Sequence, residues 1–225
     1  MDSGSERRLP ISSPDAMLSP MPDPLDEITR RTLSHYTTHA EDFRIGTWDH
    51  DVSQNVDALL SAITANAPCR ILDVGCGPGR DLVTFSRLGH HPTGLDGTAR
   101  FCQMARAASG CPVYHQDLLK LTLPPAHFHG IFANACLFHV PAVALPDVLR
   151  NLWQTLQPGG ILFSSNPRGD NQAGWGGDRY GHYHDLPGWT GFMEDAGFSA
   201  VGHYYRPPGR PRSQQPWLAS TWQKP

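Results

Sequence analysis

The stretch from Arg70 to Asp81 most constrains what this chain can fold into. Its apolar beginning predicts a short buried strand, and Gly75, Gly77 and Gly79 predict a tight turn that leads into a helix. Because glycine has no Cβ, the backbone of such a turn can adopt positive φ and approach a ligand closely. The first turn of the following helix adds unpaired N–H groups. This stretch therefore predicts a strand–turn–helix unit that binds a nucleotide-type cofactor.

Asp73, near the end of the predicted strand, indicates the charge of that cofactor. A dinucleotide would place its pyrophosphate on the turn and the helix N-terminus, where a carboxylate would repel it. The glycine spacing also departs from the dinucleotide pattern G-x-G-x-x-G, because Arg80 holds the last position. Both observations favour a positively charged cofactor. An NAD(P)-dependent oxidoreductase is the disfavoured alternative.

The run from Leu72 to Gly79 resembles motif I of the class I S-adenosylmethionine-dependent methyltransferases, and the turn at 158–160 resembles a later turn of the same family. S-adenosyl-L-methionine carries a sulfonium and an ammonium and has no phosphate, which suits a carboxylate at Asp73. The resemblance covers most of the chain. It implies an α/β, Rossmann-like fold with a mostly parallel seven-stranded sheet and an antiparallel C-terminal hairpin, and methyl transfer from S-adenosyl-L-methionine as the activity.

Apolar periodicity predicts the elements of such a fold in the implied order. Parallel strands are expected at residues 70–74, 92–96, 111–115, 130–135 and 161–165. Helices are expected at residues 82–88, 98–108, 143–156 and 189–195. The strands expected at 200–205 and 217–222 would form the hairpin. The resemblance implies that residues 27–66 form helices that fold over the cofactor as a lid.

The predicted cofactor contacts lie at the ends of successive strands. Asp96 follows the first glycine by about 20 residues, the spacing at which a carboxylate accepts hydrogen bonds from ribose hydroxyls; a helix N-cap is its alternative role. The resemblance implies that Asp117 and Leu118 contact the adenine, and a turn aspartate is the alternative. The predicted set is Asp73, Gly75, Cys76, Gly77, Gly79, Asp96, Gly97, Asp117, Leu118 and Asn134.

Three histidines are candidate general bases. His139 follows the fourth strand, at the edge where ligands of open α/β sheets bind, and histidine titrates near neutrality; fixing the loop is its alternative role. His182 and His184 lie in a long polar insertion at 166–186, which is expected to be a loop, and loops of this length are usually functional or disordered. Because this pair has no third ligand at a recognisable spacing, we expect no metal site.

Aromatic and basic residues outside the glycine turn predict the substrate contacts. Tyr36 and Trp48 fall in the lid region together with Phe43 and His50, and helix packing is the alternative role of all four. The arginines of the loop at 206–216 could bind a carboxylate or phosphate, because guanidinium donors match these anions bidentately; a solvated basic loop is the alternative. The predicted set is Tyr36, Trp48, Arg168, Tyr180, Arg206 and Arg212.

Composition narrows the function further. The 225 residues suit one domain, and the net charge of −3 argues against nucleic-acid binding. The motif Asn-Pro-Pro-Tyr of base and glutamine methylation is absent after the fourth strand, so we expect a small-molecule acceptor. No apolar run approaches the roughly 20 residues that span a bilayer, and no signal pattern is present. Five cysteines without zinc spacing indicate reduced thiols, so we expect a cytoplasmic protein.

The amino-terminal residues differ in composition from the rest. Residues 1–26 are rich in Ser, Pro and Asp, which predicts a disordered leader ahead of a single domain at 27–225. Oligomeric state is left open. The alternative to an enzyme is a catalytically silent member of the fold that binds S-adenosylmethionine as a sensor or partner subunit.

Overall fold

The computed structural model describes Met1 and residues 24–225, so most of the predicted leader lies outside the described residues. Its last residues do not belong to a leader, because helix α1 (Pro24–Thr38) begins at Pro24. Proline is favoured at the first position of a helix, where its missing N–H is not needed. Asp26 and Glu27 follow in the first turn, where carboxylates interact favourably with the helix dipole.

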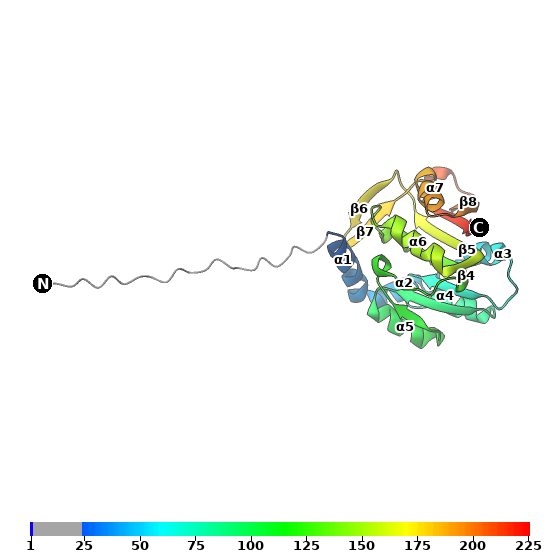
Figure 1. The fold of residues 1–225 in the computed structure, drawn as a ribbon, viewed down its shortest axis with the longest axis horizontal. Coiled ribbons are helices and arrows are strands. Elements are labelled where there is room, and N and C mark those ends of the chain that lie inside the picture. Colours follow the sequence, from blue (N-terminus) through cyan, green and yellow to red (C-terminus); the bar gives the residue numbers. More distant parts are fainter. Residues whose placement is uncertain (2–23) are drawn as a thin grey trace.

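A seven-stranded sheet with the order β3-β2-β1-β4-β5-β9-β8 forms the centre of the fold (Figure 1). Strands β1 to β5 run parallel, and β9 pairs antiparallel with both β5 and β8. This confirms the predicted fold class, including the antiparallel C-terminal pair. The strands are β1 (Arg70–Val74), β2 (His91–Asp96), β3 (Val113–His115), β4 (Phe128–Asn134), β5 (Leu156–Pro167), β8 (Ser199–Arg206) and β9 (Trp217–Gln223).

Helices cover both faces of this sheet. Successive strand residues point to opposite faces, so Ile71 packs in the cluster with Leu59 and Phe85, whereas Leu72 packs in the cluster with Leu149 and Trp189. The central strands are buried on both sides, as parallel strands require. The remaining helices are α2 (Ala40–Thr47), α3 (Ser53–Ala62), α4 (Arg80–Arg87), α5 (Ala99–Ser109), α6 (Leu145–Thr155) and α7 (Leu186–Asp195).

The insertion at 166–186 is not the loop that the sequence predicted. It contains a hairpin of β6 (Gln172–Gly176) and β7 (Arg179–Tyr183), which lies beside α1 (Figure 1). Glycines within and beside these strands weaken the strand signal, because glycine is depleted in strands. The signal that identifies the hairpin is the two-residue turn Gly177-Asp178, in which Gly177 has φ +63°.

Two observations bear on the expected environment of the protein. None of the helices in residues 24–225 is both long enough and apolar enough to cross a membrane. All five cysteines are free in the structure, and the reduced state of the thiols stays a prediction.

Lys224 stabilises the end of helix α6. Its Nζ donates to the carbonyl oxygens of Trp153 at 3.0 Å and Leu156 at 2.8 Å, and it lies 3.9 Å from the centroid of the Trp153 ring. Carbonyls at a helix C-terminus lack intrahelical partners. Because these bonds are charge-assisted and Lys224 is buried, Lys224→Met is expected to lower the free energy of unfolding by about 2 kcal/mol in a urea titration.

Lys120 offers the matched control for that substitution. Its ammonium forms an exposed ion pair with Asp26 at 2.7 Å. Exposed pairs contribute little, so Lys120→Met is expected to change the free energy of unfolding by less than about 1 kcal/mol. Equal effects of the two substitutions would contradict a capping role for Lys224.

Candidate active site

A cavity of about 710 Å³ opens at the carboxyl ends of β1, β2 and β4. Its floor consists of the turns after these strands, at 75–78, 96–98 and 134–136. Leu33, Tyr36 and Phe43 from the first two helices line the opposite side. Ligands of open α/β sheets bind at this edge, and the volume suits a cofactor-sized ligand. The cavity is therefore the candidate active site.

The three glycines of the first turn have two different roles. Gly75 has φ +67° and Gly77 has φ +51°, and both line the cavity. A Cβ on Gly75 would overlap Cys136, which closes the turn from behind. Gly79 has φ +94° but does not line the cavity; a Cβ there would lie 2.7 Å from Cα of Ala105. The predicted cofactor role of Gly79 is corrected to one in packing α5 against the turn.

Asp73 is buried directly ahead of the glycine turn, with 2% of its surface exposed. Its Oδ2 has no hydrogen-bond partner among the described residues. Burial raises the pKa of Asp73 well above its usual value, Asp81 and Asp96 raise it further, and Arg80 opposes them. Arg80 is itself paired with Asp81 through two bonds of 2.7 and 2.8 Å. A cation in the cavity would relieve this excess of negative charge, whereas a pyrophosphate would add to it.

Asp96 holds the glycine turn in place. Its Oδ2 accepts from the backbone N–H of Gly77 at 2.9 Å, and its Oδ1 accepts from that of Thr98 at 2.8 Å. The N-cap of α5 is Thr98, so the N-cap alternative for Asp96 is wrong. Burial raises the pKa of Asp96, and the two N–H donors oppose this. The Thr98 side chain also donates to this carboxylate, but a carboxylate offers about four lone-pair sites, so Asp96 can still accept a hydrogen bond from a ligand in the cavity.

The adenine candidates also lie on the cavity wall. Asp117 caps a short 3₁₀ helix by accepting from the N–H of Leu119 at 2.9 Å, so its role as a turn aspartate is real. The same residue and Leu118 line the cavity, so the two roles are compatible. Asn134, Cys76 and Gly97 line it as well, which brings together every predicted cofactor residue except Asp73 and Gly79.

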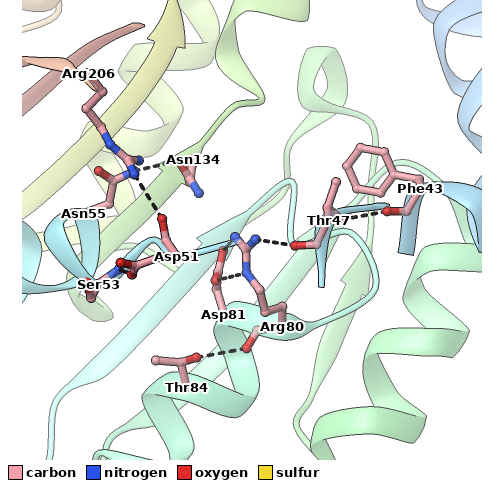
Figure 2. A network of polar contacts seen from close by, with 10 residues as sticks. All are labelled: Phe43, Thr47, Asp51, Ser53, Asn55, Arg80, Asp81, Thr84, Asn134 and Arg206. Atoms are coloured by element: carbon pink, nitrogen blue, oxygen red, sulfur yellow. Dashed lines mark hydrogen bonds and ion pairs between the residues drawn. The ribbon is translucent and has the colours of Figure 1, made fainter. Parts of the chain in front are cut away.

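Side chains of α4, β8 and α3 connect the segment between α2 and α3 to the rest of the fold (Figure 2). Arg80 Nη1 donates to the carbonyl of Thr47 at 2.9 Å, at the end of α2. Arg206 Nη2 donates to the carbonyl of Asp51 at 3.0 Å, in the segment between α2 and α3. Asn55, in α3, donates to Asn134 Oδ1 at 3.0 Å. These bonds hold the chain between α2 and α3 across the mouth of the glycine turn.

Tyr36 and His139 form a hydrogen-bonded pair on the cavity wall. His139 Nδ1 lies 2.5 Å from the carbonyl of Tyr180, which can only accept, so Nδ1 carries the proton. His139 Nε2 is therefore an acceptor, and Tyr36 Oη donates to it at 2.9 Å. Burial lowers the pKa of His139 to about 4. The imidazole is thus neutral at physiological pH, with its free lone pair directed at the Tyr36 hydroxyl.

His182 and His184 do not line the cavity, which corrects the prediction that they serve as bases there. Their rings stack at 4.3 Å, and His184 packs against Trp189 and Phe192 of α7. The hairpin turns this end of β7 toward α7 and away from the cavity. Within the described part of the chain, no group of three or more His, Cys, Asp or Glu side chains is placed to hold a metal ion.

Four predicted substrate residues also lie off the cavity wall. Arg168 donates to the carbonyls of Gln215 at 2.8 Å and Arg212 at 2.7 Å, so it fixes the loop before β9. Arg212 stacks on the ring of Tyr205, 3.0 Å from its centroid. These contacts correct the roles predicted for the two arginines. Two aromatic residues are corrected likewise: Trp48 ends α2, and the ring of Tyr180 packs on Trp175.

Among the cavity residues that the sequence did not predict, Phe101 and Arg179 contribute most to the shape and charge of the site. Phe101 packs with Tyr36 and Phe43 at ring-centroid distances of 5.9 and 5.3 Å, and these three rings form an aromatic wall. Arg179, the first residue of β7, lines the cavity beside Tyr36. Its position follows from the hairpin, so recognising the Gly177-Asp178 turn could have brought Arg179 into consideration. Phe101 carries no sequence signal beyond its place on the core-facing side of α5.

Comparisons with known proteins agree with this architecture. A family model described as a methyltransferase domain matches residues 71–160. A malonyl-[acyl-carrier protein] O-methyltransferase of Enterobacter lignolyticus is 30% identical over 133 residues, which cover 59% of this chain and 49% of that enzyme. A ubiquinone biosynthesis O-methyltransferase of Xylella fastidiosa is 35% identical over 140 residues, 55% of each chain. The chain thus spans about half the length of these relatives.

Solved structures share the fold over most of the chain. A 1,6-didemethyltoxoflavin-N1-methyltransferase of Burkholderia thailandensis, crystallised with 1,6-didemethyltoxoflavin and S-adenosylhomocysteine, matches with a TM-score of 0.73 at 21% identity, covering 95% of this chain and 98% of its own. The [4+2]-cyclase SpnF matches with a TM-score of 0.70 at 16% identity, covering 88% and 96%. At these identities the likeness establishes the fold alone.

Proposed function

We propose that this chain is a class I S-adenosylmethionine-dependent methyltransferase, and that it transfers the methyl group of S-adenosyl-L-methionine to a small-molecule acceptor; the methyltransferase-domain match over residues 71–160 supports this. The observation that carries the proposal is the buried carboxylate of Asp73, whose Oδ2 has no partner among the described residues. It lies beside the turn in which Gly75 and Gly77 line the cavity. This arrangement suits the positive methionine end of the cofactor.

The proposed cofactor contacts follow from the cavity wall. Asp96 accepts hydrogen bonds from the ribose hydroxyls. Asp117 and Leu118, which also line the cavity, contact the adenine. The backbone of Gly75 and Gly77 approaches the methionine part closely, because no Cβ intervenes. Asn134 faces the same space and is held by Asn55. All of these groups are neutral or acidic, which supports a cationic cofactor over a dinucleotide.

The chemistry requires orientation and removal of one proton. When bound, the cofactor supplies a methyl group activated by its sulfonium. The aromatic wall of Tyr36, Phe43 and Phe101 orients the acceptor, and such orientation contributes up to roughly 7–11 kcal/mol in well-aligned systems. The acceptor N–H or O–H gives its proton to Tyr36 Oη as the tyrosine proton passes to His139 Nε2. His139 thereby ends as the imidazolium, held by the Tyr180 carbonyl.

The names of the relatives support a small acceptor. These names specify malonyl-[acyl-carrier protein], ubiquinone biosynthesis and 1,6-didemethyltoxoflavin, which differ widely in structure. The cyclase SpnF has the same fold, so the fold alone does not dictate methyl transfer. A silent S-adenosylmethionine-binding subunit is therefore the second candidate. A cytoplasmic location and the absence of a nucleic-acid partner stay predictions.

The test combines binding with product identification. Calorimetry should detect binding of S-adenosylmethionine and S-adenosylhomocysteine but not of NADH; binding of NADH alone would contradict the proposal. Incubation with radiolabelled S-adenosylmethionine and fractionated cell metabolites should then yield a labelled small molecule. Cofactor binding without any labelled product from the intact protein would favour the silent subunit.

Asp96→Asn tests the ribose assignment. The amide keeps an oxygen for only one of the two backbone N–H donors and sets an NH2 group against the other, and it loses the charge that strengthens hydrogen bonds from ribose hydroxyls. The Kd for S-adenosylhomocysteine is expected to rise by about 10- to 100-fold in calorimetry. Asp117→Asn, which lies on the adenine side, provides a comparison within the same cavity. An unchanged Kd in a folded Asp96→Asn protein would remove Asp96 from the ribose contacts.

A further inference from the structure

The cavity has opposite charges on its two sides. The floor around the glycine turn carries Asp73, Asp81 and Asp96, and the single guanidinium there, Arg80, is paired with Asp81. The wall formed by the hairpin presents Arg179 instead. If one ligand places its cationic group on the floor, the positively charged wall remains for the second molecule in the cavity to contact. The acceptor, and not the cofactor, would then meet Arg179.

Arg179 forms no ion pair with any carboxylate in the described part of the chain. Its neighbour Asp178 is paired with Arg31 at 2.8 Å. Of the other two arginines on the cavity wall, Arg80 is paired with Asp81, and Arg206 donates to the carbonyl of Asp51 at the segment before α3, whereas Arg179 has a side-chain hydrogen bond with the Tyr36 hydroxyl. Arg179 is exposed, so its charge is accessible from solvent as well as from the cavity. It is the cavity guanidinium best placed to receive an anion.

Arg179 also lies next to the proposed proton acceptor. Burial raises the pKa of Tyr36, while a side-chain hydrogen bond and the charge of Arg179 lower it. His139, the partner of Tyr36, also lies within the field of Arg179. Other ionisable groups that act on this corner are His35 on α1, Asp178 on the hairpin turn, and Asp96 and Cys136 on the floor. An anion on Arg179 would hold the rest of an acceptor against the Tyr36 hydroxyl.

We propose that the acceptor carries a carboxylate or phosphate group, that Arg179 binds this group, and that the binding places the N–H or O–H to be methylated at Tyr36. The proposal rests on the proposed function and narrows its substrate class. The sequence suggested the arginines of the loop at 206–216 for the same purpose; of these, Arg212 stacks on Tyr205, and Arg206 lines the cavity but donates to the carbonyl of Asp51. Guanidinium suits both anions, because its two parallel N–H groups match two oxygens.

Small aromatic probes that differ in charge, with benzoate and benzamide matched in shape, test the proposal without knowledge of the substrate. Benzoate, phenyl phosphate and the neutral benzamide are titrated into the full chain saturated with S-adenosylhomocysteine, at low ionic strength, and followed by NMR chemical shifts. At least one anion is expected to bind about 10-fold more tightly than benzamide. Preference for benzoate or for phenyl phosphate assigns the group as carboxylate or phosphate.

Variants locate the anion preference in the chain. Arg179→Gln is expected to abolish it, and Arg179→Lys is expected to retain only part of it, because an ammonium lacks the bidentate geometry. Arg168→Gln, off the cavity, should leave it unchanged. The Kd for S-adenosylhomocysteine should be the same in Arg179→Gln and wild type, which separates this test from that of the proposed function. Equal binding of anions and benzamide, no binding of either anion, or a preference that survives in Arg179→Gln would overturn the proposal.

Discussion

Substitution of Gly75 with alanine is expected to raise the Kd for S-adenosylhomocysteine by at least about 100-fold. The residue has φ +67°, where a side chain costs about 1–2 kcal/mol. Its new Cβ would overlap Cβ of Cys136 on the loop after β4. Neither side can yield freely, because Cys136 is buried in the core and Gly75 continues strand β1. The turn must therefore move, and the floor of the cavity moves with it.

Gly89 provides the matched control. It has φ +82°, and no atom lies within 4 Å of a Cβ built on it. Gly89→Ala therefore carries the same kind of backbone strain without the steric overlap, and its Kd should equal that of the wild type. Calorimetry gives both affinities, and urea titration should show a loss of stability about 1–3 kcal/mol larger for Gly75→Ala. Equal affinities of the two variants would contradict the assigned role of the turn.

Removal of the Tyr36 hydroxyl is expected to lower kcat by about 10²- to 10⁴-fold, once an acceptor is identified. Tyr36→Phe keeps the ring contacts with Phe43 and Phe101 but breaks the bond to His139. His139→Gln keeps a donor for the Tyr180 carbonyl but has no basic nitrogen. The Kd for S-adenosylhomocysteine should stay within about 3-fold of the wild type in both variants, because the change affects proton removal and not cofactor binding.

The double variant separates a working pair from two structural residues. If Tyr36 and His139 act as one unit, the variant that lacks both groups should be no slower than the slower single variant. If the two residues acted independently, the losses of kcat in the single variants would multiply in the double variant. A Tyr36→Phe protein with wild-type kcat would exclude the hydroxyl from proton transfer.

The pH dependence follows from the burial of His139. Since burial lowers its pKa from 6.5 to about 4, the imidazole stays unprotonated, and available as a base, well below neutral pH. The acidic limb of kcat/KM that His139 contributes is therefore expected near pH 4, and no limb from this residue is expected near 6.5. A limb near 6.5 that disappears in His139→Gln would contradict the buried, neutral imidazole.

The same pKa shift makes stability depend on pH. Between pH 6.5 and about 4 the unfolded chain binds a proton at this histidine and the folded chain does not. Stability is therefore lost as pH falls through this window, by up to about 3 kcal/mol, and levels off below it. His139→Gln should remove that portion of the acid sensitivity in urea titrations at neutral and acidic pH.

Local sequence determined the fold and the floor of the site. The motif from Leu72 to Gly79, followed by strands and helices in regular alternation, specifies a parallel sheet because each pattern reflects burial within its own element. Asp96, Asp117 and Asn134 could be predicted as neighbours for the same reason. Parallel strands end at one edge, so residues just after them meet there whatever the details of packing.

Tertiary structure decided the rest of the site. Tyr36 and His139 are 103 residues apart, and only the docking of α1 over the sheet brings them within 2.9 Å. Gly79 looked like a ligand glycine but serves the packing of α5, and His182 and His184 face α7 because the hairpin orients β7. Arg179 reaches the cavity through the same hairpin. Such contacts depend on how separate elements pack, which no local sequence pattern encodes. The acceptor side of the cavity is built almost entirely from contacts of this kind.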